Sequence, residues 1–183
     1  MNNVIFNIPN TISWFRIILT AVIVLMMYLQ LYLLAFILFL IASVSDYFDG
    51  FIARKTKQVT NLGKVLDQMS DKILITSVLI IFVELRIVPG WLVVILVFRD
   101  TLVSVVRMLA TGSGKVIAAN VFGKFKTVSQ IILTVGLFMQ ITDIFYISEF
   151  MVTLNKIMVY VVAIVTIISG VIYLYQNREH LNT

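Results

Sequence analysis

Four aspartates stand in two closely spaced pairs within residues 46–71, which read DYFDGFIARKTKQVTNLGKVLDQMSD. Asp46 and Asp49 are three residues apart, and Asp67 and Asp71 are four apart, so each pair shares one face if its segment is helical. Carboxylates held close together repel one another and need cations to neutralise them. The chain has no cysteine and a single histidine, so these oxygen ligands predict a site for Mg²⁺, Mn²⁺ or Ca²⁺.

Two divalent cations in such a site could clamp a diphosphate, stabilise a leaving group and orient an attack. The alternative is that the aspartates are solvated residues at helix ends, paired with Arg54, Lys64 and Lys72. Each pair, however, adjoins a long apolar run, and ionisable groups that border membrane spans are candidates for function. We therefore favour the metal site.

The elements that must position these aspartates are strongly apolar. Of 183 residues, 61% are hydrophobic and only 13% are charged, and the mean hydropathy is +1.05. A soluble domain has roughly 45–50% apolar and about 25% charged residues. The composition thus predicts a protein of the lipid bilayer, and the net charge of +5 suits an anionic membrane surface better than nucleic acid. We expect no cleavable signal peptide, because the first apolar run lacks a basic start and a small-residue cleavage site.

Six apolar runs are each long enough for a transmembrane helix, which needs about 20 residues. We predict an all-α polytopic protein of one domain, with spans at about 12–29, 31–52, 66–84, 89–111, 122–142 and 151–175. Residues 1–9 predict a short interfacial segment that ends at Pro9, with Asn10 or Ser13 as the cap of the first helix. The link near Gln30 is so short that the first two spans should be antiparallel neighbours.

Basic residues gather in two of the links between spans, and the opposite links carry mostly acidic ones. Cytoplasmic links are enriched in lysine and arginine, so both termini and the aspartate pairs should face the cytoplasm of a cell membrane. The residues that set this orientation are Arg54, Lys55, Lys57, Lys64, Lys115, Lys124 and Lys126 on one side, and Glu84, Arg86, Asp143 and Glu149 on the other.

The aspartates also belong to a longer pattern. It resembles the signature of the CDP-alcohol phosphatidyltransferase family, D-x2-D-G-x2-A-R-x8-G-x3-D-x3-D, at every fixed position. The matching residues are Asp46, Asp49, Gly50, Ala53, Arg54, Gly63, Asp67 and Asp71. The family's six-span architecture extends the resemblance over nearly the whole chain.

The resemblance implies a role for each motif residue. The four aspartates would hold two divalent cations (Mg²⁺ or Mn²⁺), and Asp71 would also be the base that deprotonates the acceptor hydroxyl. CDP-diacylglycerol, as the donor, would contact Asn10, Thr11, Ile12, Ser13, Gly50, Ala53, Arg54, Thr60 and Gly63. Read without the family, Gly50 and Ala53 leave a surface that a planar base or a phosphate could approach closely. The alternative for Gly50 and Gly63 is close packing between helices. The resemblance also implies a homodimer.

Further segments resemble the branch of the family whose acceptor is glycerol-3-phosphate. They are the opening NIPNTISWFRI, VTNLGK at 59–64, Arg99-Asp100, Arg107, VIAA at 116–119 and GKFKT at 123–127. The branch usually reads LDP-x-ADK where this chain has LDQMSDK at 66–72, a departure that removes no metal ligand but weakens the inference about the acceptor.

The acceptor side can also be read from charge alone. Arg99 and Arg107 interrupt an apolar run, where a charge costs roughly 2.5–3.5 kcal/mol on insertion scales. Asp100 and Arg107, seven residues apart, could face one cavity, and with Lys124 and Lys126 could line a basic pocket for a small phosphate. Lys64 joins these four basic residues as a candidate acceptor contact. The alternative is that these side chains snorkel to the interface or pair internally.

Other functions remain open from the sequence. Within the same family the acceptor could be phosphatidylglycerol, giving cardiolipin, or serine or inositol phosphate. A membrane transporter is the alternative of a different class, but its charges should spread across the membrane depth, whereas these aspartates cluster at one face. A structural helper in a membrane complex would not need four convergent carboxylates.

Overall fold

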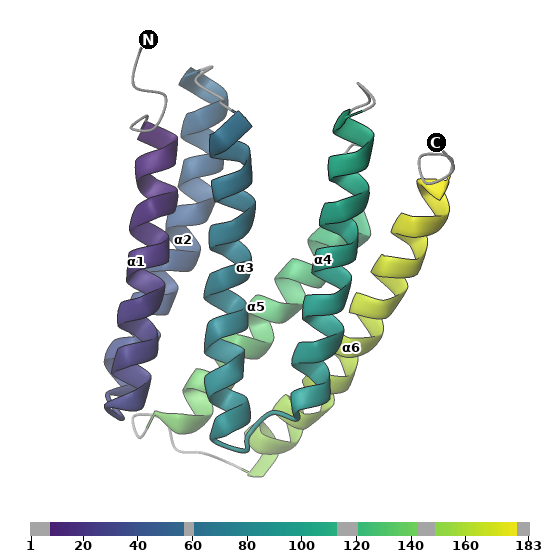
Figure 1. The fold of residues 1–183 in the computed structure, drawn as a ribbon. Coiled ribbons are helices and arrows are strands. Elements are labelled where there is room, and N and C mark those ends of the chain that lie inside the picture. The colour runs from purple at the N-terminus through teal and green to yellow at the C-terminus, as the bar shows by residue number, and fades with distance from the viewer. Residues whose placement is uncertain (1–7, 57–60, 113–120, 143–148, 179–183) are drawn as a thin grey trace. The chain divides into compact units, whose positions relative to one another are not determined.

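The computed structural model describes residues 8–56, 61–112, 121–142 and 149–178, with side chains for 13–45, 69–108, 122–142 and 149–178. These residues form helices and contain no strand. The helices are α1 (Ile8–Tyr28), α2 (Tyr32–Thr56), α3 (Asn61–Glu84), α4 (Gly90–Gly112), α5 (Val121–Ile141) and α6 (Glu149–Gln176) (Figure 1). The predicted all-α class and the six helices are confirmed for the part of the chain that the structure describes.

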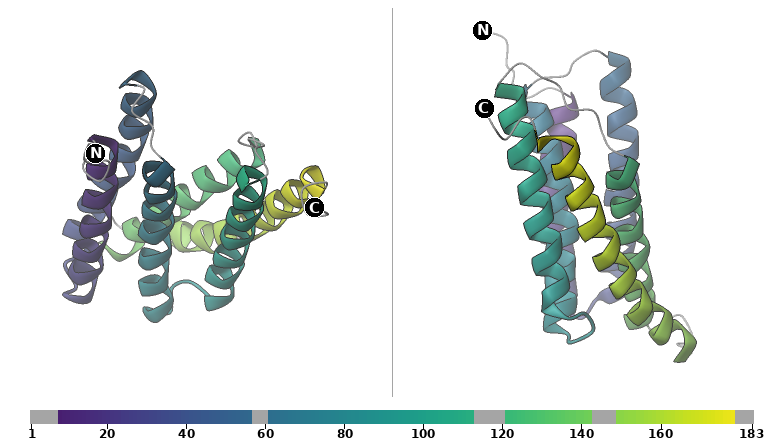
Figure 2. Two further views of the ribbon diagram at one scale, coloured as in Figure 1. Left: turned by 45° about the horizontal axis from the view of Figure 1, so that its top comes forward. Right: turned by 90° about the vertical axis from the view of Figure 1, so that its right-hand side faces the viewer.

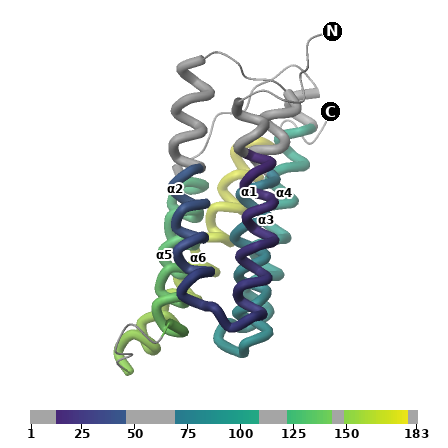
Figure 3. The backbone as a smooth tube through the Cα atoms, turned by 90° about the vertical axis from the view of Figure 1, so that its left-hand side faces the viewer, coloured from purple at the N-terminus to yellow at the C-terminus, as the bar shows by residue number. Residues whose placement is uncertain are grey.

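The chain divides into two compact units, and the boundary falls in the last turn of α3. The first unit, residues 1–81, holds α1, α2 and most of α3, with α1 packed against α2 (Figure 3). The second unit, residues 82–183, holds α4, α5 and α6, with α6 packed against both α4 and α5 (Figure 2).

Two helices end in the same way, at a residue in the left-handed conformation. Gln30 has φ 60°, and its amide donates to Met27 while that of Leu31 donates to Met26. Arg86, with φ 58°, repeats this pattern at the end of α3. Both are Schellman motifs, which satisfy the last carbonyls of a helix and turn the chain sharply. The predicted tight link at Gln30 is therefore confirmed, with α1 and α2 as antiparallel neighbours (Figure 3).

The helix ends differ from the predicted spans where the sequence becomes polar. The first helix begins at Ile8, so the predicted break at Pro9 and the cap at Asn10 or Ser13 are wrong. Proline is tolerated in a first turn, because amides there have no acceptor within the helix. Similarly, α2 runs to Thr56 and α3 starts at Asn61, because a helix can continue beyond its apolar stretch.

The buried side of α6 mixes polar with apolar residues, and its exposed side is largely apolar. Its buried residues include Asn155, Thr166, Ser169 and Tyr173, whereas its exposed side carries large apolar groups such as Phe150, at 74% exposure. Among the described residues, α6 alone is both long and apolar enough to cross a membrane by length and composition. The six-span architecture is therefore not established by helix length and hydropathy.

Candidate functional site

The aspartate motif lies on two consecutive helices joined by four residues. Asp46 lies ten residues before the end of α2, and Asp71 lies ten residues after the start of α3. At 1.5 Å per residue, both are about 15 Å along their helix from the link. Asp49 and Asp67 are correspondingly nearer to it. The helices thus carry the two pairs at matching depths, each pair on one face of its helix.

Of the four aspartates predicted to bind metal, Asp71 alone has a described side chain. For Asp46, Asp49 and Asp67 only the helical backbone is described, and Thr60 lies outside the described residues. The roles predicted for all of these residues stay predictions. Among the predicted site residues, those with a described backbone but no described side chain are Asn10, Thr11, Ile12, Asp46, Asp49, Gly50, Ala53, Arg54, Gly63, Lys64 and Asp67.

Asp71 is held by a buried arginine of α1. Nη1 of Arg16 forms an ion pair with Oδ1 of Asp71 and also donates to Oγ of Ser70 at 3.1 Å. The Arg16 side chain is 1% exposed and that of Asp71 is 43% exposed. The carboxylate is therefore anchored from the protein interior while part of it stays exposed.

Ser13 is the one predicted donor contact whose side chain is described. It is 3% exposed and lies three residues before Arg16, so the two share a face of α1. The same face thus carries a candidate donor contact and the anchor of Asp71. The sequence analysis included Arg16 only within the segment NIPNTISWFRI and predicted no role for it. A charge inside an apolar helix is itself a signal of function.

The donor set of the motif fits a hard divalent cation. Four carboxylates without histidine or thiolate match the ligands that Mg²⁺ and Mn²⁺ accept. Among residues with described side chains, no three His, Cys, Asp or Glu groups lie together. Three of the four predicted ligands are outside that set, so the metal site stays a prediction.

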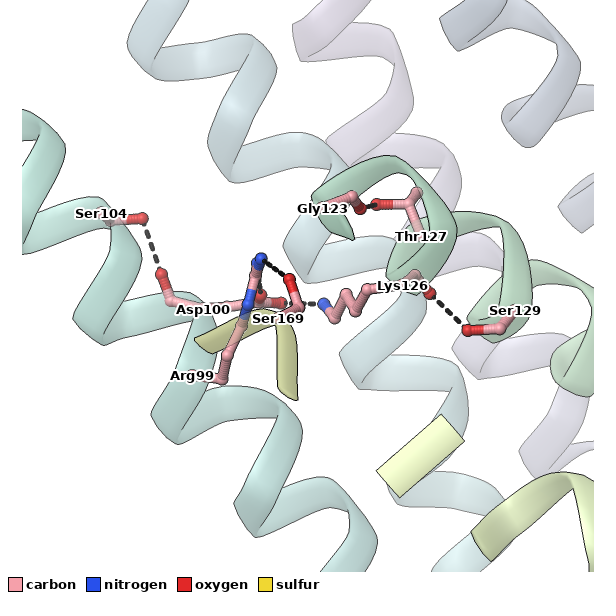
Figure 4. Close-up of polar contacts among 8 residues, drawn as sticks. All are labelled: Arg99, Asp100, Ser104, Gly123, Lys126, Thr127, Ser129 and Ser169. Carbon is pink, nitrogen blue, oxygen red and sulfur yellow. Dashed lines mark hydrogen bonds and ion pairs between the residues drawn. The ribbon is translucent and has the colours of Figure 1, made fainter. Parts of the chain in front are cut away.

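A second polar cluster joins the three helices of the second unit (Figure 4). Asp100 of α4 accepts from Nη1 of Arg99 at 3.0 Å and from Nζ of Lys126, on α5, at 2.6 Å. Arg99 also donates from Nη2 to Oγ of Ser169, on α6, at 2.7 Å. We call these four residues the Asp100 cluster. Sequence reasoning missed Ser169, since serine is common in membrane helices and its partner is remote in sequence.

The other predicted acceptor contacts lie apart from this cluster or outside the described side chains. Lys124 is exposed, whereas Lys126 is 4% exposed, because residues two apart on a helix face different ways. Arg107 is half-buried two turns farther along α4. Asp100 pairs with Arg99 and Lys126. The cavity that Asp100 was predicted to share with Arg107 stays a prediction. Of the five predicted acceptor contacts, the structure thus brings together Arg99 and Lys126.

Comparison with known proteins gives a consistent answer. The model of the CDP-alcohol phosphatidyltransferase family matches residues 6–172. A Bacillus subtilis protein named CDP-diacylglycerol–glycerol-3-phosphate 3-phosphatidyltransferase is 34% identical over 97% of this chain and 98% of its own length. A Haemophilus influenzae protein of the same name is 34% identical over 96% of each chain. A Sodalis glossinidius protein of that name is 31% identical over 96% of this chain and 97% of its own.

Proposed function

This chain belongs to the CDP-alcohol phosphatidyltransferase family, and on that premise we propose that it transfers the phosphatidyl group of CDP-diacylglycerol to glycerol-3-phosphate, releasing CMP. The product is phosphatidylglycerophosphate, which serves phospholipid biosynthesis. The names of relatives that align over nearly the whole chain support this acceptor. The observation that carries the reaction type is the placement of the four motif aspartates at matching depths on α2 and α3.

The reaction is a displacement at phosphorus. The acceptor's hydroxyl oxygen attacks the phosphorus that bears diacylglycerol, and the bond from that phosphorus to the bridging oxygen of CMP breaks. CMP leaves with the electron pair, and Asp71 takes the hydroxyl proton as general base. Its ion pair with Arg16 keeps the carboxylate oriented, and its 43% exposure leaves room for the acceptor.

Asp46, Asp49, Asp67 and Asp71 would hold two divalent cations. When bound, these ions supply charge neutralisation for the diphosphate and for the departing CMP. Gly50, Arg54, Thr60 and the buried Ser13 are the proposed donor contacts, with Arg54 as the charged one. Arg99 and Lys126 are the proposed contacts of the acceptor phosphate, because they form the basic core of the Asp100 cluster.

The protein is polytopic, with α1 to α6 as six membrane spans and the basic links in the cytoplasm. The large apolar groups on the exposed side of α6 support lipid as the solvent, since soluble proteins rarely expose large apolar patches. The chain contains no cysteine, so a cysteine placed at Gln58 is a unique label. It should resist an impermeant thiol reagent in intact cells and react after lysis. Reaction in intact cells would reverse the orientation.

The enzyme is a homodimer by resemblance to its family. The mass of the purified protein in detergent, measured by light scattering, tests this directly. A mass of one chain over the working range of concentrations would contradict it.

An acceptor panel tests the proposed reaction. Purified full-length protein is given CDP-diacylglycerol with glycerol-3-phosphate, phosphatidylglycerol, serine or inositol phosphate, and lipid products are identified by mass. We expect phosphatidylglycerophosphate from glycerol-3-phosphate and little product from the others. Cardiolipin formed from phosphatidylglycerol, with glycerol-3-phosphate ignored, would establish the alternative within the family. No CMP release with any acceptor would contradict transferase activity itself.

A further inference from the structure

The Asp100 cluster contains two cations around one carboxylate, in the interior of a helical unit. Side-chain exposure is 13% for Arg99, 16% for Asp100 and 5% for Lys126. A lysine so deeply buried needs a charged partner, because desolvating an isolated ammonium is very costly. Asp100 supplies that partner through Oδ2, and its other oxygen holds Arg99.

Arg99 is fixed at several points along its length. Its two terminal nitrogens are divided between Asp100 and Ser169, which sets the plane of the guanidinium (Figure 4). The stem passes close to Gly170 of α6, where an added Cβ would lie 3.1 Å from Arg99 Cγ. An added Cβ at Gly123 of α5 would lie 3.6 Å from Nη2. Glycines at these two points let the arginine cross between the helices.

One donor of Arg99, its Nε–H group, makes no hydrogen bond within the described residues. The nitrogen is buried. Buried donors are almost always paired with protein or water, so this nitrogen calls for water or a ligand oxygen. The cluster also keeps a net charge of +1, from Arg99, Lys126 and Asp100, in a setting of weak screening. An anion is the complementary ligand.

We propose that Asp100 is a positioning residue of the acceptor site, which holds Arg99 and Lys126 in the arrangement that binds the phosphate of glycerol-3-phosphate. The proposal rests on the proposed function and extends it to a residue that touches neither substrate. Asp100 keeps two like charges together at the junction of α4 and α5, where they would otherwise repel. Ser169 fixes the same arginine from α6.

Steady-state kinetics of Asp100→Asn in the full-length protein test this role. We expect the KM for glycerol-3-phosphate to rise about ten- to a hundredfold, as for a lost charge-assisted contact. The KM for CDP-diacylglycerol should change less than about twofold, because donor contacts lie on other residues. Because Asp100 acts through Arg99 and Lys126, the double variant with Lys126→Met should raise this KM by less than the product of the two single effects.

A control separates positioning from general loss of stability. Asn155→Ala removes two partly buried hydrogen bonds between α6 and α5, to Gly136 and Gln140, which lie outside the cluster. It should lower the unfolding temperature without raising the KM for glycerol-3-phosphate. Ser169→Ala removes one contact of Arg99 and no charge, so a rise of a few-fold in that KM is expected even if Asp100→Asn fails to fold.

Ligand-induced thermal stabilisation gives a readout besides activity. Glycerol-3-phosphate should raise the unfolding temperature of the wild type, raise it somewhat less in Ser169→Ala and raise it much less in Asp100→Asn. Suppose that the wild type uses glycerol-3-phosphate, and that both variants keep the wild-type KM and the wild-type thermal stabilisation by this ligand. That result would overturn the proposed role of the cluster and leave the proposed function standing. The role would also be overturned if Asp100→Asn raised the KM for glycerol-3-phosphate and the KM for CDP-diacylglycerol equally. The same holds if the effects of Asp100→Asn and Lys126→Met on the KM for glycerol-3-phosphate multiplied in the double variant. A wild type with neither turnover nor stabilisation would contradict the proposed function, and the inference with it.

Discussion

Arg16, buried on α1, forms an ion pair with Asp71 on α3. The same nitrogen of Arg16 also donates to Ser70, so the arginine binds two consecutive residues of the motif helix. This contact ties α1 to the helix that carries the proposed base. It also explains how a carboxylate at 43% exposure can keep a fixed orientation.

Replacing Arg16 with glutamine should lower both stability and turnover. The change removes the Arg16 cation from Asp71, and because that carboxylate is partly exposed we expect a loss of about 1–3 kcal/mol, less than for a fully buried pair. The kcat should fall more than either KM changes, since the base loses its orientation. Thermal unfolding in detergent and steady-state kinetics measure the two effects. Arg86→Gln, in an exposed turn, is the control, and an equal effect of the two changes would contradict the role of Arg16.

Removal of divalent metal should abolish activity. The motif contains four carboxylates within 26 residues, and cations are the means of neutralising them when they converge. Activity should be absent in EDTA and return on addition of Mg²⁺ or Mn²⁺, as measured by CMP release. Unchanged turnover in metal-free buffer would exclude a role for the aspartates as metal ligands.

Replacing Asp71 or Asp49 with asparagine should impair different steps of the reaction. Asp71→Asn keeps the shape of the side chain and removes the base, so transfer should be abolished while metal and donor binding partly remain. Asp49→Asn should weaken metal binding as well. Titration of activity with Mn²⁺, together with donor binding by calorimetry, separates the two. Near wild-type turnover of Asp71→Asn would show that another group is the base.

Gly136→Ala should destabilise the packing of α5 on α6. An added Cβ at Gly136 would lie well inside van der Waals contact of Oδ1 of Asn155, whose amide donates to Gly136 and Gln140. Displacing that buried side chain should cost about 1–3 kcal/mol, measured as a lower unfolding temperature. Gly90→Ala is the matched control, because its Cβ would meet Val83 at an ordinary 3.6 Å. Equal stability of the two variants would show that Asn155 moves at no cost.

Hydropathy was enough to predict the number of helices, because each apolar run is close to the length of one helix. It could not place the ends of α2 and α3, which continue into polar sequence that carries the motif. It also misplaced the start of α1, since Pro9 is compatible with a first turn. Such ends depend on backbone hydrogen bonding, on which composition has little influence.

The candidate site shows a similar division. Spacing singled out the four aspartates as candidate metal ligands, and charge singled out Arg99, Arg107, Lys124 and Lys126 as candidate acceptor contacts. Of these four basic residues, the structure brings together Arg99 and Lys126. The different exposure of Lys124 and Lys126 follows from helical geometry and was within reach of the sequence. The partners Arg16 with Asp71, and Arg99 with Ser169, could not be found, because 55 and 70 residues separate them and the packing of helices decides which faces meet.

The proposed transfer of the phosphatidyl group from CDP-diacylglycerol to glycerol-3-phosphate is tested most directly by a double-label balance. Purified protein in vesicles receives CDP-diacylglycerol labelled in the cytidine and glycerol-3-phosphate carrying a second label. We predict that CMP release and incorporation of glycerol-3-phosphate into lipid are equal, and that both require both substrates. CMP release that is independent of glycerol-3-phosphate, with no second label in the lipid, would contradict this reaction.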